Sequence, residues 1–275
     1  MDAFVATQPR VVEAALNYLA PGIDAPFVYT DVPPPGMPAR NGRSEAHRIA
    51  IHDARPLMRR LSLDTEGFEL RRHPSQVVDF YDDDAVRRVY YPEIDALLRA
   101  ATGAAKIVIF DHTLRNTAAG QSGQRIREAG AHVHNDYTVA SAAKRVRDLL
   151  EPAEAETRLQ RRFVEINVWR PIAEPVESWP LALCDAQSLD WSDLVVAERR
   201  YPDRVGETYA VRFNPRHRWF YFPQMRRDEA LLIKCFDSAT DGRARLSVHS
   251  AFEDPTTRPD APPRESIEIR AFAFF

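Results

Sequence analysis

The chain has few of the features that mark secreted, zinc-binding or membrane proteins. Its 275 residues include two cysteines, Cys184 and Cys235, and both lie in apolar runs. This placement favours two buried free thiols over a disulfide framework or a zinc site. No hydrophobic run reaches the length of a transmembrane helix, and residues 1–7 lack the basic and apolar regions of a signal peptide. The sequence therefore predicts a soluble cytoplasmic protein with no membrane partner.

An excess of charge of one sign is also absent. The net charge is -3, and acidic and basic residues are interleaved along the chain. No basic stripe is present that would follow a phosphate backbone, so nucleic acid is not expected as a partner. Hydrophobic residues make up 44% of the chain and charged residues 28%, which is ordinary for a globular protein.

Helical patterns predominate in the first 150 residues. Residues 10–19 carry apolar side chains at helical spacing, which predicts a short amphipathic helix. A longer helix is predicted over 82–101, where an acidic start favours a helix N-terminus. Residues 105–111 form a β-branched run typical of a strand. A third helix is predicted over 138–150, after a capping threonine.

After residue 160 the pattern changes to short strands separated by turn residues. Residues 214–217 are typical of a tight hairpin connection. The predicted strands are 163–169, 181–184, 193–196, 207–213, 218–222, 231–236, 245–249 and 266–275. Eight strands after helices favour a jelly roll whose outer sheet is covered by helices. We expect a mainly β protein with flanking helices and a single domain, 1–275, in which a helix-rich part at 1–100 supplies a candidate lid.

The functional prediction depends on residues 132–138. His134 and Asp136 are two residues apart, so both can lie on one face at a strand end and bind one metal ion. Imidazole and carboxylate suit Fe(II) when one more histidine completes a facial triad and leaves the opposite face open. One late histidine, His249, ends the penultimate predicted strand. A His-x-Asp triplet also occurs by chance, in a loop that caps the helix after it.

The last predicted strand carries polar residues on one face. Arg264 and Ser266 point the same way in a strand, so a guanidinium and a hydroxyl can bind one carboxylate together, as a 2-oxoacid requires. Glu268 and Arg270 continue this face, and apolar residues at 267, 269, 271 and 273 form the other. The polar face can line the mouth of an eight-stranded barrel. Alternatively, Arg270 and Glu268 form an inter-strand salt network.

Other residues leave alternatives open. His132 is either a neighbour of a metal ligand or a structural histidine. Lys234 lies in an apolar strand and needs a partner, which is either Asp237 or a substrate carboxylate. The aromatic side chains expected to wall a compact substrate pocket are Trp169, Trp219, Tyr221 and Phe222.

Five blocks of the sequence resemble a known family. They are VHNDYT at 133–138, NVWRPI at 167–172, PLALCD at 180–185, DEALLIKCFDS at 228–238 and RESIEIR at 264–270. In this order they resemble the CmcJ/NvfI-type hydroxylase/desaturase family of Fe(II)/2-oxoglutarate-dependent oxygenases, which includes enzymes of cephamycin and fungal meroterpenoid biosynthesis. The resemblance extends from around residue 105 to the C-terminus.

The resemblance implies a double-stranded β-helix core, of the jelly-roll or cupin-like kind, over 105–275. In that core His134, Asp136 and His249 would be the catalytic iron ligands, and Arg264 with Ser266 would bind the distal carboxylate of 2-oxoglutarate. Arg270 is a further cofactor-binding candidate. Arg264 is expected to be the main anchor, because Arg270 lies roughly 20 Å further along the strand.

The implied enzyme is a dioxygenase that hydroxylates, desaturates or cyclises a small secondary-metabolite-type substrate, with release of succinate and carbon dioxide. The substrate's identity and the oligomeric state, a homodimer included, stay open. The lid would come from residues 31–36 or from 114–130, where Gly120 and Gly123 allow a hinge.

Two other functions use some of the same residues. A metal-dependent hydrolase would use the three ligands to activate water and would have no need of Arg264 and Ser266. A non-catalytic cupin-like protein would bind a small molecule without iron-dependent turnover.

Overall fold

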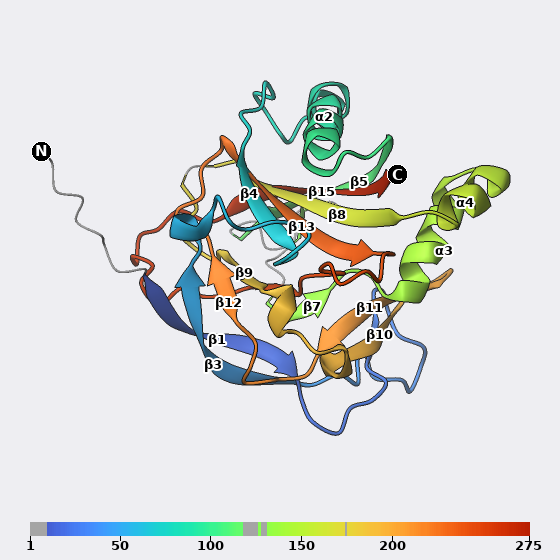
Figure 1. The fold of residues 1–275 in the computed structure, drawn as a ribbon. Helices are drawn as coiled ribbons and strands as arrows, with labels where there is room; N and C mark the ends of the chain where they lie inside the picture. The colour runs from blue at the N-terminus through green and yellow to red at the C-terminus, as the bar shows by residue number, and fades with distance from the viewer. Residues whose placement is uncertain (1–9, 118–125, 128–130, 174) are drawn as a thin grey trace, which may run out of the picture.

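The computed structural model describes residues 10–117, 126–127, 131–173 and 175–275. Its strands form two curved sheets, which lie one above the other in Figure 1. The nine-stranded sheet has the order β1 (Val11–Leu19), β3 (Ser44–Asp53), β12 (Trp219–Tyr221), β9 (Leu181–Cys184), β14 (His249–Ala251), β7 (His134–Asn135), β11 (Val205–Val211), β10 (Leu194–Arg200) and β2 (Phe27–Tyr29). The six-stranded sheet has the order β4 (Phe68–Arg72), β13 (Glu229–Asp237), β8 (Phe163–Pro171), β15 (Glu265–Phe274), β5 (Lys106–Asn116) and β6 (Ile126–Arg127). The predicted mainly β, jelly-roll core is confirmed.

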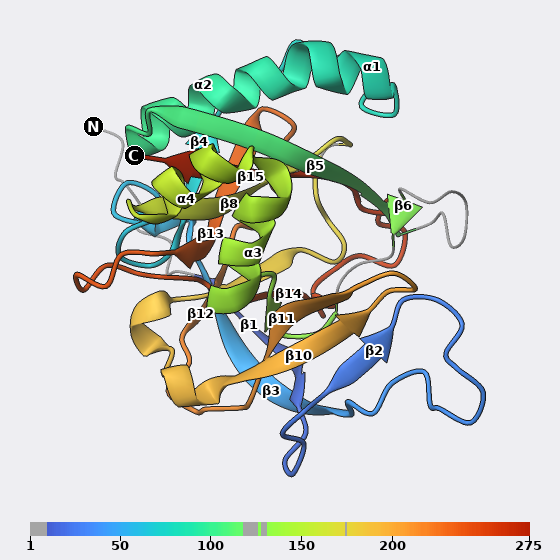
Figure 2. The ribbon, with the colours of Figure 1, turned by 90° about the vertical axis from the view of Figure 1, so that its right-hand side faces the viewer.

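One long helical segment covers the outer face of the six-stranded sheet (Figure 2). It consists of α1 (Asp83–Ala85), a π-helical turn (Val86–Tyr90) and α2 (Tyr91–Thr102). The Asp82 side chain caps its N-terminus by accepting bonds from two backbone N–H groups. Gly103 ends the segment in the left-handed region, at φ 73°. The helix predicted over 82–101 is therefore confirmed.

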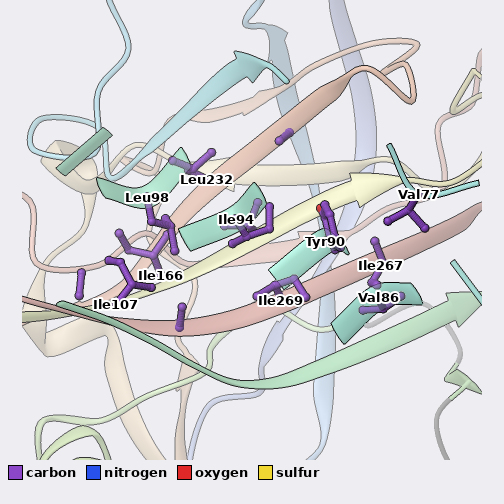
Figure 3. Close-up of a cluster of buried hydrophobic side chains, with 14 of the residues drawn as sticks. Val77, Val86, Tyr90, Ile94, Leu98, Ile107, Ile166, Leu232, Ile267 and Ile269 are labelled. Atoms are coloured by element: carbon purple, nitrogen blue, oxygen red, sulfur yellow. The ribbon is translucent and has the colours of Figure 1, made fainter. Parts of the chain in front are cut away.

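Strand alternation divides the six-stranded sheet into an apolar outer face and a polar inner face. On β15, Ile267 and Ile269 pack against Tyr90 and Ile94 of the covering helix (Figure 3). Because neighbouring side chains on a strand point to opposite faces, Ser266, Glu268 and Arg270 are directed between the two sheets. The two predicted faces of the last strand are thus confirmed, and the inner face supplies polar side chains to the site.

Two further helices lie at one side of the sheets (Figure 1). α3 (Val139–Leu149) begins with a capping box formed by Thr138 and Ser141, as expected from the capping threonine. α4 (Pro152–Leu159) follows it, and both helices pack on a cluster of phenylalanines that includes Phe272. Since α3 starts directly after the His-x-Asp segment, its packing fixes where that segment leaves the sheet.

Residues 10–19 form a strand, so the predicted amphipathic helix is wrong. β1 pairs antiparallel with β3, and Val12, Ala14, Leu16 and Tyr18 are buried at every second position. The same apolar residues fit both the helical period and the two-residue period of a strand. Only pairing with β3 decides between a helix and a strand. Residues 10–100 contain four strands and one long helical segment, so this part is not helix-rich.

Two predictions within the strand-rich half are also corrected. Residues 214–217 form a turn but no hairpin, because β7, β14 and β9 lie between β11 and β12 in the sheet. The strand expected at 245–249 begins only at His249. A turn sequence specifies a chain reversal, whereas strand pairing is decided by contacts far along the chain.

Both cysteines are buried and free, as predicted. In the described part of the chain, no helix has the length and apolarity needed to cross a membrane.

Lys234 has the carboxylate partner that its burial requires. Its Nζ donates to Asp237 Oδ2 and Asp64 Oδ1, both at 2.8 Å, and to the Ala244 carbonyl at 3.0 Å. Asp237 also binds Arg162 at 2.7 Å and is fully buried. Of the two alternatives for Lys234, the structure shows the pair with Asp237.

We expect Asp237→Ala to lower the free energy of unfolding by about 3–5 kcal/mol, because it leaves Lys234 without its buried partner. Asp148→Ala, which removes an exposed pair with Lys144, is the matched control and should cost less than about 1 kcal/mol. Urea denaturation measures both changes. Equal effects of the two variants would contradict a structural role for the buried pair.

Candidate metal centre

Three candidate ligands meet at the junction of β7 and β14. The two strands are neighbours, and His249 pairs with His134 in register. Their ring centroids lie 4.6 Å apart, and His134 Nε2 is 3.5 Å from Asp136 Oδ1. One ligand atom from each of His134, Asp136 and His249 lies within 4.8 Å of the other two. Sheet pairing therefore brings together residues from distant parts of the chain.

Hydrogen bonds orient two of these side chains. The His134 Nδ1 position lies 2.7 Å from the His132 carbonyl, so an N–H there donates to that oxygen and Nε2 keeps its lone pair for a metal. Asp136 Oδ2 accepts from Asn167 Nδ2 at 2.8 Å and from Arg270 Nε at 3.2 Å. Both neighbours engage the same oxygen, which leaves Oδ1 on the side of His134.

The local electrostatics keep His249 and Asp136 in metal-binding forms. Burial lowers the pKa of His249 to about 4, and His134 adds to this effect. Burial opposes ionisation of Asp136, but Arg270 and His134 hold its pKa well below the usual value. At neutral pH the group thus includes a neutral imidazole and a carboxylate. Two imidazoles and one carboxylate in a compact group match the donors of a non-haem Fe(II) site.

Arg270 lies beside the candidate ligands, which corrects the expectation that it is remote from the metal. In the sheet it pairs with Asn167, and both side chains reach Asp136. The metal group therefore faces the C-terminal half of β15, which the sequence spacing alone did not indicate. Arg270 also binds Glu268 and Asp111, so the inter-strand salt network that the sequence left open is present.

Arg264 and Ser266 are buried and have unused hydrogen-bonding groups. Arg264 donates to the Trp179 carbonyl through Nη1, but among the described residues its Nε and Nη2 have no hydrogen-bond partner, and neither does Ser266 Oγ. Burial, with a contribution from Arg115, lowers the pKa of Arg264 to about 9. A buried guanidinium without a carboxylate is costly unless a ligand supplies the anion. These donors fit the distal carboxylate of 2-oxoglutarate.

A cavity of about 670 Å³ opens at His134 and Asp136. Its described apolar lining includes Leu19, Phe27, Val28, Phe110, Tyr137 and Tyr209, which come from both halves of the chain. The aromatic walls expected from the sequence are not in this lining. Trp169, Trp219, Tyr221 and Phe222 are at most 2% exposed and belong to the core.

The segments proposed as a lid are only partly described. Residues 31–36 are exposed except for the half-buried Pro33, and the cavity is lined on both sides of them by residues 26–28 and by Arg40 and residues 42–44. Gly120 and Gly123 lie outside the described residues. His132 lines the cavity and its Nδ1 lies 3.0 Å from Ser44 Oγ, so its ring has a neighbour other than the metal group.

A jelly roll with a His/Asp/His group and a buried unpaired arginine defines a class, the non-haem iron oxygenases. Comparison with known proteins specifies the family. A family model described as an Oxidoreductase/YMDC permease-like domain matches residues 16–274. The Fe(II)/2-oxoglutarate-dependent dioxygenase NvfI of Aspergillus novofumigatus is 34% identical over 273 residues, which are 95% of this chain and 96% of that protein.

Two further comparisons agree. The alpha-ketoglutarate-dependent dioxygenase phiK of a fungal species is 32% identical over 283 residues, covering 100% of both proteins. A solved structure of a variant of the iron and alpha-ketoglutarate-dependent endoperoxidase NvfI matches with a TM-score of 0.89 at 28% identity, covering 99% of each chain. The chain belongs to this family of Fe(II)/2-oxoglutarate-dependent oxygenases, and the resemblance of the five sequence blocks is confirmed.

We expect Asn167→Ala to weaken Co(II) binding by about 10–100-fold, because the substitution removes a donor that orients Asp136. Visible absorption of bound Co(II), which stands in for Fe(II), measures the affinity. Asn214→Ala is the control, since that amide lies in the turn between β11 and β12, binds Asp193 just before β10, and should leave the affinity unchanged when it is replaced. Wild-type affinity in Asn167→Ala would contradict the positioning role.

Proposed function

We propose that this protein is an Fe(II)/2-oxoglutarate-dependent oxygenase of a small secondary-metabolite-type substrate, with His134, Asp136 and His249 as its iron ligands. The observation that carries the proposal is the meeting of three ligand atoms within 4.8 Å, in a fold that also buries the unpaired Arg264. A metal-dependent hydrolase needs the three ligands but has no need of the buried Arg264. A non-catalytic binding protein needs neither.

Iron, 2-oxoglutarate and dioxygen, when bound, supply an oxidant that removes hydrogen from the substrate, with release of succinate and carbon dioxide. Asn167 and Arg270 hold Asp136 Oδ2, so the carboxylate presents Oδ1 to the metal position. Arg264 and Ser266 bind the distal carboxylate of the cosubstrate through charge-assisted hydrogen bonds.

The inner face of β15 connects the two parts of the proposed site. Glu268 interacts electrostatically with Asp136 and His249 at one end, and Ser266 is the next inward residue of the strand. The cosubstrate would bind along this face between the metal group and Ser266, and the long Arg264 side chain would have to extend toward its distal carboxylate, because six residues separate Arg264 from Arg270 on the strand. The cavity wall then determines which substrate C–H group faces the metal, and this pose selects hydroxylation, desaturation or cyclisation.

The proposal extends to the domain organisation and the cellular location of the protein. We propose that residues 1–275 act as one domain. Two buried free thiols are typical of a reducing compartment, and a cytoplasmic location is part of the proposal.

With Fe(II), ascorbate and 2-oxoglutarate, the purified protein should produce succinate, and a chelator should stop it. His134→Ala and His249→Ala should abolish succinate formation, because each removes an iron ligand. His52→Ala, which changes an exposed histidine of β3, is the control and should retain activity. Succinate formation by His249→Ala, or substrate turnover that needs metal but no 2-oxoglutarate, would overturn the assignment.

Arg264→Lys should raise the Michaelis constant for 2-oxoglutarate about tenfold or more, since a lysine cannot form the paired hydrogen bonds of a guanidinium. Arg270→Lys should mainly weaken iron retention, because Arg270 contacts Asp136. Steady-state succinate assays and measured iron content separate the two effects. A larger rise in the Michaelis constant for Arg270→Lys would identify Arg270 as the anchor.

A further inference from the structure

Three arginines in the lining of the cavity beside the metal group have no carboxylate partner among the described residues. Arg40 and Arg43 come from the chain between β2 and β3, and Arg145 comes from α3. Within the described residues, none of the three forms an ion pair. The Arg145 guanidinium instead lies over the Phe110 ring, 5.0 Å from its centroid. These cations are therefore available to a ligand in the cavity.

The acidic side chains of the cavity lining already have partners. The pairs among described residues are Asp148 with Lys144 (2.8 Å), Glu198 with Arg200 (2.7 Å), Glu207 with the Thr138 hydroxyl (2.9 Å), and Asp111 and Asp136 with Arg270 (3.2 Å each). The chain as a whole carries a net charge of -3. Uncompensated positive charge at this wall is thus a local feature and does not follow from the composition.

The arginines adjoin an apolar path to the metal group. Phe110, under Arg145, contacts Tyr137 with ring centroids 6.4 Å apart. Tyr137 directly follows Asp136 in the sequence. Elsewhere in the lining, Ser44 binds His132, which places the segment carrying Arg40 and Arg43 against the start of β7. Cationic groups and apolar rings are therefore arranged as an amphipathic ligand requires.

We propose that the substrate is an amphipathic organic acid, whose anionic group is bound by Arg145 together with Arg40 and Arg43. Its apolar part lies over Phe110 and Tyr137 and extends toward the metal group. A guanidinium binds a carboxylate or a sulfonate through paired, charge-assisted hydrogen bonds. The cosubstrate does not explain these cations, because its distal carboxylate has the separate, buried Arg264. The inference rests on the proposed function, in which this cavity receives the substrate.

Two fluorescent probes that differ by one charged group test the proposal. The first is 8-anilinonaphthalene-1-sulfonate, and the second is N-phenyl-1-naphthylamine, which has the same rings without the sulfonate. Binding is measured by fluorescence titration of the protein with Fe(II) and 2-oxoglutarate under nitrogen, so that Arg264 is occupied. The wild-type protein should bind the sulfonate about tenfold more tightly than the neutral probe, which is the effect of one charge-assisted hydrogen bond.

Arg145→Gln and the double variant Arg40→Gln/Arg43→Gln should each weaken sulfonate binding about tenfold. Binding of the neutral probe should not change, which also shows that the cavity of each variant is folded. Lys144→Gln is the matched control, because Lys144 lines the same cavity but is bound to Asp148. It should change the affinity by less than about threefold.

Competition with fatty acids tests the carboxylate form of the ligand. Dodecanoate should displace the sulfonate probe, and methyl dodecanoate should not. Equal displacement by the acid and its ester, equal affinity for both probes, or unchanged sulfonate binding in the arginine variants would overturn the proposal. These titrations do not require turnover. A protein that binds the acids but forms no succinate would therefore contradict the oxygenase assignment and leave only the binding of organic acids in this cavity supported.

Discussion

The buried Arg270 guanidinium is the interaction on which the site depends most. It lies between the two sheets and binds Asp136 from the nine-stranded side and Glu268 and Asp111 from the six-stranded side. Those carboxylates raise its pKa well above the usual value, against the effect of burial. A buried ion network tolerates the loss of a member poorly. The same contacts that join the sheets therefore fix the orientation of a candidate iron ligand.

Besides the ion pairs of Arg270, a neutral carboxyl group limits the negative charge that is buried near the site. Glu165 is fully buried near this network, and among the described residues its carboxyl group has only the Cys235 side chain as a hydrogen-bonding neighbour. Burial and the proximity of Asp136 raise its pKa well above the usual range, which favours the neutral acid. Arg270 is thus left to the carboxylates around Asp136, while Arg264 keeps unused donors for an anion.

Much of the fold could be predicted because its signals are local. The alternation of Ser266, Ile267, Glu268, Ile269 and Arg270 specified two faces of one strand, and the same faces occur in the structure. Capping residues and apolar spacing specified the helices at 82–101 and 138–150. The spacing of His134 and Asp136 also indicated a metal ligand pair before any partner was known. Such patterns depend on the geometry of a single element.

Other features were decided by contacts between distant segments. The apolar residues of 10–19 fit the spacing of a helix or of a strand, and pairing with β3 made this segment a strand. Pairing of β15 with β8 placed Arg270, and not the start of the strand, beside Asp136. The arginines at 40, 43 and 145 line one cavity only because two separate segments, the connection between β2 and β3 and helix α3, converge there. The sequence alone determined which residues could bind iron. Strand register decided which of these residues lie close together. Register is fixed by cross-strand contacts, which no local sequence pattern contains.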